Sequence, residues 1–186
     1  MNTVDPSKNP QVERRIREFL AALNSGGGAP IETLSPAAAR KVLVDVQASV
    51  PLDLPACDIE EKSVTQDGLQ VSLTIVRPAG STSTLPGFLF IHGGGWILGD
   101  FPTHERFVRD LVADSGFTAI FVNYTPSPEA KYPTAINEIH AAAKWVAAHG
   151  GDPGGCKPPR HLRKQRWRKH VRRRRAQGPA RGRPEV

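Results

Sequence analysis

The chain has 186 residues, 39% of them hydrophobic and 23% charged, with a formal net charge of +7 at pH 7. This length suits one domain. No run of residues approaches the ~20 apolar positions of a membrane span, and residues 1–18 lack the apolar core of a secretory leader. Cys57 and Cys156 are the only cysteines, without metal-ligand spacing around them, which argues against a disulfide-based fold or a metal site. We therefore expect a cytoplasmic protein without cofactor or metal.

The charge is divided between two unlike segments. Residues 1–155 contain 12 Lys and Arg against 17 Asp and Glu, whereas residues 156–186 contain 13 Lys and Arg against one Glu. The second segment has too few apolar residues to offset the chain entropy lost on folding. We expect a folded, acidic body and a basic, disordered tail over residues 154–186.

Two amphipathic helices are predicted near the N-terminus. In residues 10–23 the apolar positions fall at helical spacing, and the glycines at 26–28 end the pattern. Ser35 is a suitable N-cap and Pro36 a suitable first residue for a second helix that ends near Ser49. Because their polar faces carry both signs of charge, we expect the apolar faces to pack against the body rather than on a membrane or a partner. These helices define a first unit, residues 1–50.

A hairpin and two strand–helix pairs are predicted next. Residues 59–65 and 69–76 are alternating or β-branched runs, and Gln66-Asp67-Gly68 between them is typical of a hairpin turn. Strand-like and helix-like segments then alternate: residues 86–91, 106–115, 118–124 and 134–149. This order predicts an α/β fold with a mostly parallel sheet over residues 51–153.

His92, Gly93, Gly94, Gly95 and Trp96 directly follow the strand at 86–91. An acyl-transfer enzyme needs preorganised N–H donors where a carbonyl oxygen becomes negative, and glycine lets the chain turn sharply and a substrate approach the backbone. The motif therefore predicts an oxyanion-binding loop rather than a Gly-rich turn without a chemical role.

The groups that would complete a serine-hydrolase triad are missing from this sequence. No serine follows Ser127, no aspartate follows Asp152, and no Gly-x-Ser-x-Gly elbow occurs anywhere. The chain offers no nucleophile, triad acid or triad base, so we predict that it is catalytically inactive.

Two segments make the chain similar to the hormone-sensitive-lipase-like branch of the α/β-hydrolase fold, whose esterases and lipases carry His-Gly-Gly-Gly. The first extends from Ile91 through the glycine loop to Gly99 and Asp100. The second, residues 122–133, resembles the family's loop of Tyr, Pro-Glu and aromatic-Pro. The resemblance covers roughly residues 10–153. It implies the N-terminal half of an α/β-hydrolase fold, with the first two helices as part of the family's cap and the chain truncated before the nucleophile elbow.

The resemblance also implies roles for the motif residues. The backbone amides of Gly93 and Gly94 become the oxyanion donors, and Gly95 allows tight packing. His92 is a structural neighbour of the loop rather than the triad histidine, and Trp96 supports the motif and is a candidate for lining the acyl pocket. The intact family member is expected to cleave small acyl esters through a serine acyl-enzyme. The oligomeric state stays open.

The basic tail has a possible origin in a reading-frame shift near Gly154 and Gly155. Codons for residues 163–170 can be written so that loss of the first base, with one base of Val171 added, spells Gly-Asn-Ser-Val-Gly-Gly-Asn-Met. Trp167 has a single codon, and its shifted codon must encode glycine, at a position where the elbow requires glycine. We therefore interpret residues 154–186 as a frameshift product that replaces the elbow.

The alternative takes the basic tail at face value. Repeated arginines and Trp167 would neutralise phosphates of RNA or DNA, which would make the chain a non-enzymatic nucleic-acid-binding protein. No recognition fold accompanies the tail, so we expect its binding to be nonspecific.

Overall fold

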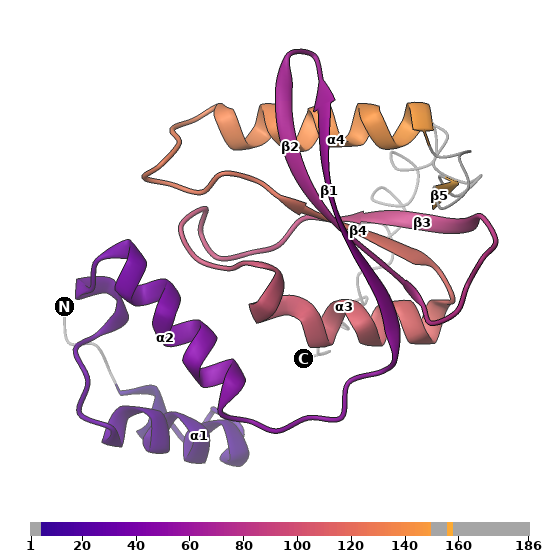
Figure 1. Cartoon of the computed structure of the whole chain (residues 1–186). Coiled ribbons are helices and arrows are strands. Elements are labelled where there is room, and N and C mark those ends of the chain that lie inside the picture. The colour runs from indigo at the N-terminus through magenta and orange to yellow at the C-terminus, as the bar shows by residue number, and fades with distance from the viewer. Residues whose placement is uncertain (1–4, 150–155, 158–186) are drawn as a thin grey trace, which may run out of the picture.

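Figure 1 shows the computed structural model, which describes residues 5–149 and the backbone of a two-residue strand at 156–157. The elements before the sheet are η1 (Pro6–Lys8), α1 (Arg14–Ser25), η2 (Ile31–Thr33) and α2 (Pro36–Ala48). The elements that follow are β1 (Cys57–Gln66), β2 (Leu69–Pro78), β3 (Leu85–Phe90), α3 (Phe101–Ser115), β4 (Thr118–Asn123), α4 (Thr134–His149) and β5 (Cys156–Lys157). The rest of the predicted tail at 154–186, and the frameshift interpretation, lie outside the described residues.

The strands form one sheet in the order β1-β2-β4-β3-β5. β1 and β2 are the predicted hairpin, and Asp67 and Gly68 at its turn have φ values of 54° and 75°, in the left-handed region that a two-residue hairpin turn requires. β2 lies antiparallel to β4, while β3 lies parallel to both β4 and β5. The predicted α/β fold is confirmed. The sheet is mixed because the hairpin joins the parallel strands through β2.

Helices α3 and α4 cover opposite faces of the sheet (Figure 1). Ile120 and Val122 of β4 pack with α4, whereas Ala119 and Phe121 pack with α3. Successive side chains of a strand point to opposite faces, so a strand covered on both sides is apolar throughout. All four side chains are buried. β4 is therefore the centre of the core, and the loops after the parallel strands β3 and β4 meet at one edge of the sheet.

The helix boundaries follow local capping signals. α2 begins after Ser35, as predicted, and the Ser35 hydroxyl accepts a hydrogen bond from the Ala38 amide at 3.3 Å. α4 has the predicted bounds. α3 begins five residues before the predicted start, because Asp100 and Thr103 form a capping box with bonds of 2.9 and 3.0 Å. Gly116 ends α3 in the left-handed conformation, as expected of a C-terminal glycine.

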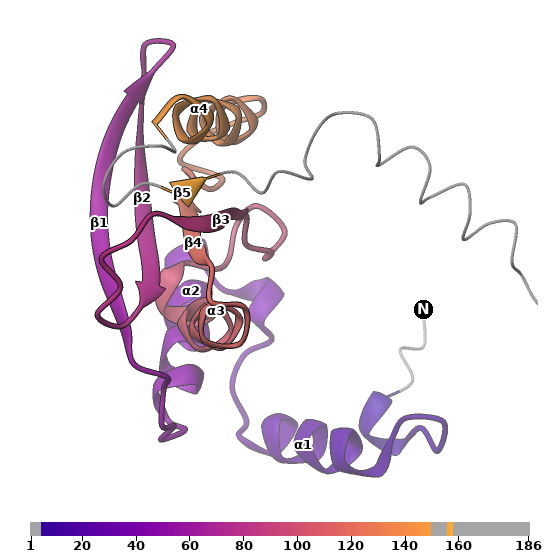
Figure 2. The same cartoon turned by 90° about the vertical axis from the view of Figure 1, so that its right-hand side faces the viewer.

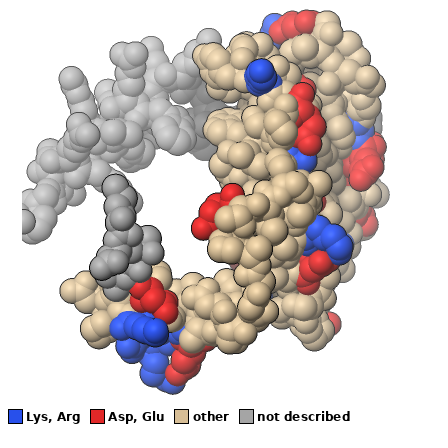
Figure 3. All heavy atoms as spheres, turned by 90° about the vertical axis from the view of Figure 1, so that its left-hand side faces the viewer, with Lys and Arg blue, Asp and Glu red and all other residues tan. Residues whose placement is uncertain are grey.

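The packing expected for the first helix is not found. α1 has no buried residue, and Ile16, Phe19 and Leu23 on its apolar face are each more than half exposed. Its main neighbour among the described residues is η1, and Figure 2 shows it away from the sheet. Figure 3 shows both signs of charge side by side at this end of the molecule. Helical spacing predicts which side chains share a face, but it does not determine which surface covers that face.

Helix α2, in contrast, contacts α3 and buries Ala39. None of the helices within residues 5–149 is both long and apolar enough to cross a bilayer. The position of α2 beside α3 brings Arg40 within reach of the loops that follow β3 and β4, and these loops hold the predicted site.

Candidate active site

The predicted oxyanion loop follows β3 directly and is exposed from Gly93 to Ile97. Gly94 has a φ of 125°, and a Cβ atom there would overlap the carbonyl group of Leu98. The Gly94 carbonyl accepts hydrogen bonds from the amides of Ile97 at 3.2 Å and Leu98 at 2.9 Å. The loop is thus a tight turn closed by backbone contacts, and only glycine fits at position 94.

The ring of His92 lies beneath this turn and is 6% exposed. It stacks on Tyr124, with ring centroids 4.3 Å apart and planes 7° apart, and on Phe121, with centroids 5.3 Å apart. Burial lowers the pKa of His92, so the neutral ring is favoured. Its Nδ1 is 2.8 Å from the carbonyl oxygen of Gly93, which assigns the proton of the neutral ring to Nδ1.

Two carbonyl groups of the loop are held by buried side chains. Tyr124 donates its hydroxyl proton to the carbonyl oxygen of His92 at 3.0 Å, and Nδ1 of His92 donates to the carbonyl oxygen of Gly93. In a trans peptide the N–H of the next residue points opposite to the C=O. The N–H groups of Gly93 and Gly94 therefore point away from the buried pair. Within the described residues, neither of these amides donates a hydrogen bond to the protein.

A largely apolar cavity of about 300 Å³ lies on the C-terminal side of the loop. Its lining includes loop residues and residues from the segment between β4 and α4: Gly95, Trp96, Ile97, Thr125, Ser127, Ala130, Lys131, Tyr132, Pro133, Ala135 and Ile136. Trp96 is half-exposed, with a φ of 66°, and its carbonyl accepts a hydrogen bond from the Ser127 amide at 2.7 Å. The structure thus places Trp96 at a cavity that begins at Gly95, the residue after the two unpaired amides.

The five motif residues are contiguous in the chain, and the structure gives each a distinct environment. His92 is buried, Gly93 and Gly94 present their amides, Gly95 has a φ of 63° without steric contact, and Trp96 lines the cavity. Sequence reasoning included Tyr124 in the resemblance but did not find its role as a donor to the loop. In residues 5–149 we find no group of three or more His, Cys, Asp or Glu side chains that could hold a metal.

Comparisons with known proteins identify relatives of this chain. A family model described as the α/β-hydrolase fold matches residues 88–175. The crystal structure of a thermostable esterase from Pseudomonas putida superposes on this chain with a TM-score of 0.74, and the two sequences are 52% identical. The match covers 78% of this chain and 47% of the esterase. The chain belongs to the α/β-hydrolase fold family. The predicted resemblance is confirmed, and the described part of this α/β hydrolase contains the hairpin, the parallel strands and the glycine loop.

Other relatives are similar over shorter parts of their length. Carboxylesterase NlhH of Mycobacterium tuberculosis is 34% identical over 103 residues, which are 55% of this α/β hydrolase and 32% of the carboxylesterase. An α/β hydrolase of Acanthamoeba polyphaga mimivirus is 32% identical over 141 residues, which are 76% of this chain and 39% of the viral protein. The chain spans less than half the length of each of these relatives.

Proposed function

We propose that this chain carries the oxyanion-binding half of a carboxylic ester hydrolase, with the Gly93 and Gly94 amides as the donors. The observation that carries the proposal is the pair of exposed, unpaired amides whose peptide planes are set by Tyr124 and His92. Its relatives include a carboxylesterase and a thermostable esterase, which further supports ester hydrolysis as the chemistry of the family.

The chemical role of these amides is electrostatic. When a nucleophile attacks an ester, the carbonyl oxygen becomes negative, and two N–H donors already in place stabilise that charge without reorganisation. Removal of one such donor costs an acyl-transfer enzyme about 3–4 kcal/mol of transition-state stabilisation. The apolar cavity beside Trp96 supports a small acyl ester as the ligand, because it offers few polar partners. The cytoplasm remains our proposed location.

The same proposal holds that this chain does not turn over esters by itself. An oxyanion site stabilises a charge that arises only after attack, and this sequence contains no serine-hydrolase elbow. The test is an assay of the purified chain with p-nitrophenyl acetate and butyrate. We expect no release of p-nitrophenol above the buffer rate. Turnover that is proportional to protein concentration and abolished by a serine-directed organophosphate would refute the proposed inactivity.

We further propose that residues 154–186 are the frameshifted remnant of the elbow segment. The proposal rests on the abrupt change of charge, from 12 Lys and Arg against 17 Asp and Glu in residues 1–155 to 13 against one in residues 156–186, and on the glycine that the shifted codon of Trp167 must encode. Sequencing of the gene across residues 150–186 tests this, with a serine codon expected across the bases of Gln165 and Arg166 in the shifted frame. Absence of that codon would contradict the proposal.

A second candidate function rests on the basic tail. Its 13 Lys and Arg against one Glu favour contact with nucleic-acid phosphates. Fluorescence anisotropy with a single-stranded RNA between 50 and 200 mM salt would measure this contact. A steep salt dependence would report charge alone, whereas a preference among sequences that survives at 200 mM salt would support a specific function.

A further inference from the structure

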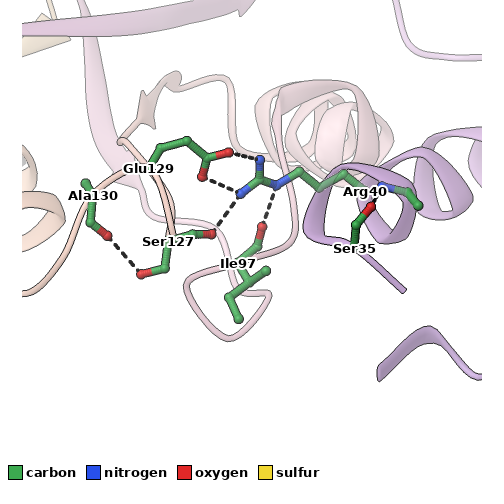
Figure 4. Close-up of polar contacts among 7 residues, drawn as sticks. Ser35, Arg40, Ile97, Ser127, Glu129 and Ala130 are labelled. Atoms are coloured by element: carbon green, nitrogen blue, oxygen red, sulfur yellow. Dashed lines mark hydrogen bonds and ion pairs between the residues drawn. The ribbon is translucent and has the colours of Figure 1, made fainter. Parts of the chain in front are cut away.

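Arg40 of helix α2 reaches across to two loops of the candidate site (Figure 4). Its Nε donates to the carbonyl oxygen of Ile97 at 2.7 Å, and one terminal nitrogen donates to the carbonyl oxygen of Ser127 at 2.8 Å. The two terminal nitrogens also bind both carboxylate oxygens of Glu129, at 2.7 and 2.8 Å. One guanidinium group thus makes four hydrogen bonds to segments that lie 57 to 89 residues further along the chain.

These contacts join loops that already touch each other. The Ser127 amide donates to the carbonyl oxygen of Trp96, so the residue before Ile97 is tied to the second loop. The Ile97 amide in turn donates to the carbonyl oxygen of Gly94, and the amide of Gly94 is one of the candidate oxyanion donors. Ile97 is thus connected to the candidate site by one hydrogen-bonded turn. Arg40 adds hydrogen bonds to both loops, and its side chain is 26% exposed.

The ion pair with Glu129 orients the guanidinium group. Hydrogen bonding to Arg40 lowers the pKa of Glu129 to about 2, so the carboxylate stays charged at neutral pH. A bidentate carboxylate fixes the plane of the guanidinium group, and the remaining N–H donors then point in set directions. In this chain the remaining donors point to the carbonyl oxygens of Ile97 and Ser127. A lysine could pair with Glu129, but its single nitrogen cannot reproduce this planar fork.

We propose that Arg40 is a positioning residue for the glycine loop. Arg40 holds Ile97, at the end of this loop, in place through its bonds to the carbonyl groups of Ile97 and Ser127. This inference rests on the proposed function for its importance to catalysis, because a displacement of about 1 Å in a catalytic group can cost ~100-fold in rate. It also links the N-terminal helices to the candidate site, since α2 and the loop share this contact.

The test compares two substitutions in the full chain by hydrogen exchange at the amides of Ile97, Leu98 and Ser127. Arg40→Lys keeps a cation for Glu129 and removes the fork, so we expect about tenfold faster exchange at these amides, as for the loss of a typical hydrogen bond. Glu129→Gln keeps the guanidinium group, so we expect a smaller effect. Lys41→Met is the matched control, because among the described residues Lys41 pairs only with Asp45, on the exposed side of α2, and we expect no change in exchange at the three amides.

A second readout reports the loop itself. Trp96 can be labelled with 5-fluorotryptophan and its ¹⁹F signal assigned by loss in a Trp96→Phe variant. We expect the Trp96 signal to shift or broaden in Arg40→Lys and to stay unchanged in Lys41→Met, while far-UV circular dichroism shows that the helices persist. If Arg40→Lys did not fold, Arg40→Gln would serve in its place.

The outcomes separate the proposal from its alternatives. Fast exchange in Arg40→Lys together with a weaker effect in Glu129→Gln supports positioning through the carbonyl contacts. Equal effects in the two variants, a larger effect in Glu129→Gln, or unchanged exchange in both would overturn it. None of these measurements uses an ester, so the result is independent of whether the proposed hydrolase chemistry is right.

Discussion

The three glycines of the loop provide a graded test of its geometry by substitution with alanine. Gly93 has an ordinary φ and open space around its Cβ direction, so Gly93→Ala is expected to be neutral or to stabilise by up to about 0.5 kcal/mol through the unfolded state. Gly95 has a φ of 63° and no steric neighbour in the part of the chain that the structure describes, so Gly95→Ala carries only the left-handed backbone cost of about 1 kcal/mol.

Gly94→Ala combines two costs. A φ of 125° lies outside the left-handed helical region, and forcing a side chain there costs about 1–3 kcal/mol. The added Cβ would also overlap the Leu98 carbonyl group, and overpacking of this kind costs about 1–3 kcal/mol more. We therefore expect a loss of about 2–6 kcal/mol, a large part of the stability of an ordinary domain.

The assay is urea denaturation of the full chain, followed by far-UV circular dichroism, for all three variants. The expected order of destabilisation is Gly94→Ala, then Gly95→Ala, then Gly93→Ala. Gly93→Ala is the matched control, because it adds the same methyl group to the same loop. A Gly94→Ala midpoint equal to that of Gly93→Ala would refute the turn geometry on which the site depends.

The buried pair beneath the loop gives two more predictions. Because burial lowers the pKa of His92, the unfolded chain binds more protons than the native chain below the ordinary value of 6.5, and stability falls as the pH decreases from 6.5 towards the native pKa. His92→Phe should flatten this part of a thermal-midpoint profile; a profile as steep as that of the unsubstituted chain would contradict the assignment. Tyr124→Phe removes the donor to the His92 carbonyl and should cost about 1–2 kcal/mol in urea denaturation. A cost near zero would show that this bond does not hold the loop.

Local signals in the sequence predicted many of the elements. Asp67-Gly68 specified the hairpin turn, Ser35-Pro36 the start of α2, and Gly116 the end of α3, because each acts on its own backbone. The capping box at Asp100 is a local signal too, and it starts α3 five residues before the predicted start at Arg106. The glycine motif likewise predicted a loop with free amides, and its oxyanion role stays a prediction.

Contacts between distant segments could not be predicted in this way. Nothing near Arg40 in the sequence indicates that its guanidinium group meets Ile97, Ser127 and Glu129, and the apolar spacing of α1 did not reveal that its face stays exposed. The burial of His92 against Tyr124 is a contact of the same kind, made across 32 residues of chain.

The sequence by itself determined the α-helices, the strands β1 to β4, the hairpin and a glycine loop at the end of β3, because hydrophobic periodicity, capping and turn chemistry act over a few neighbouring residues. Only the tertiary structure decided that β4 lies between β2 and β3, and that Tyr124 and His92 orient the peptide groups of the loop. The physical reason is that strand order and side-chain contacts depend on which surfaces bury one another, and that choice is made by the folded chain as a whole.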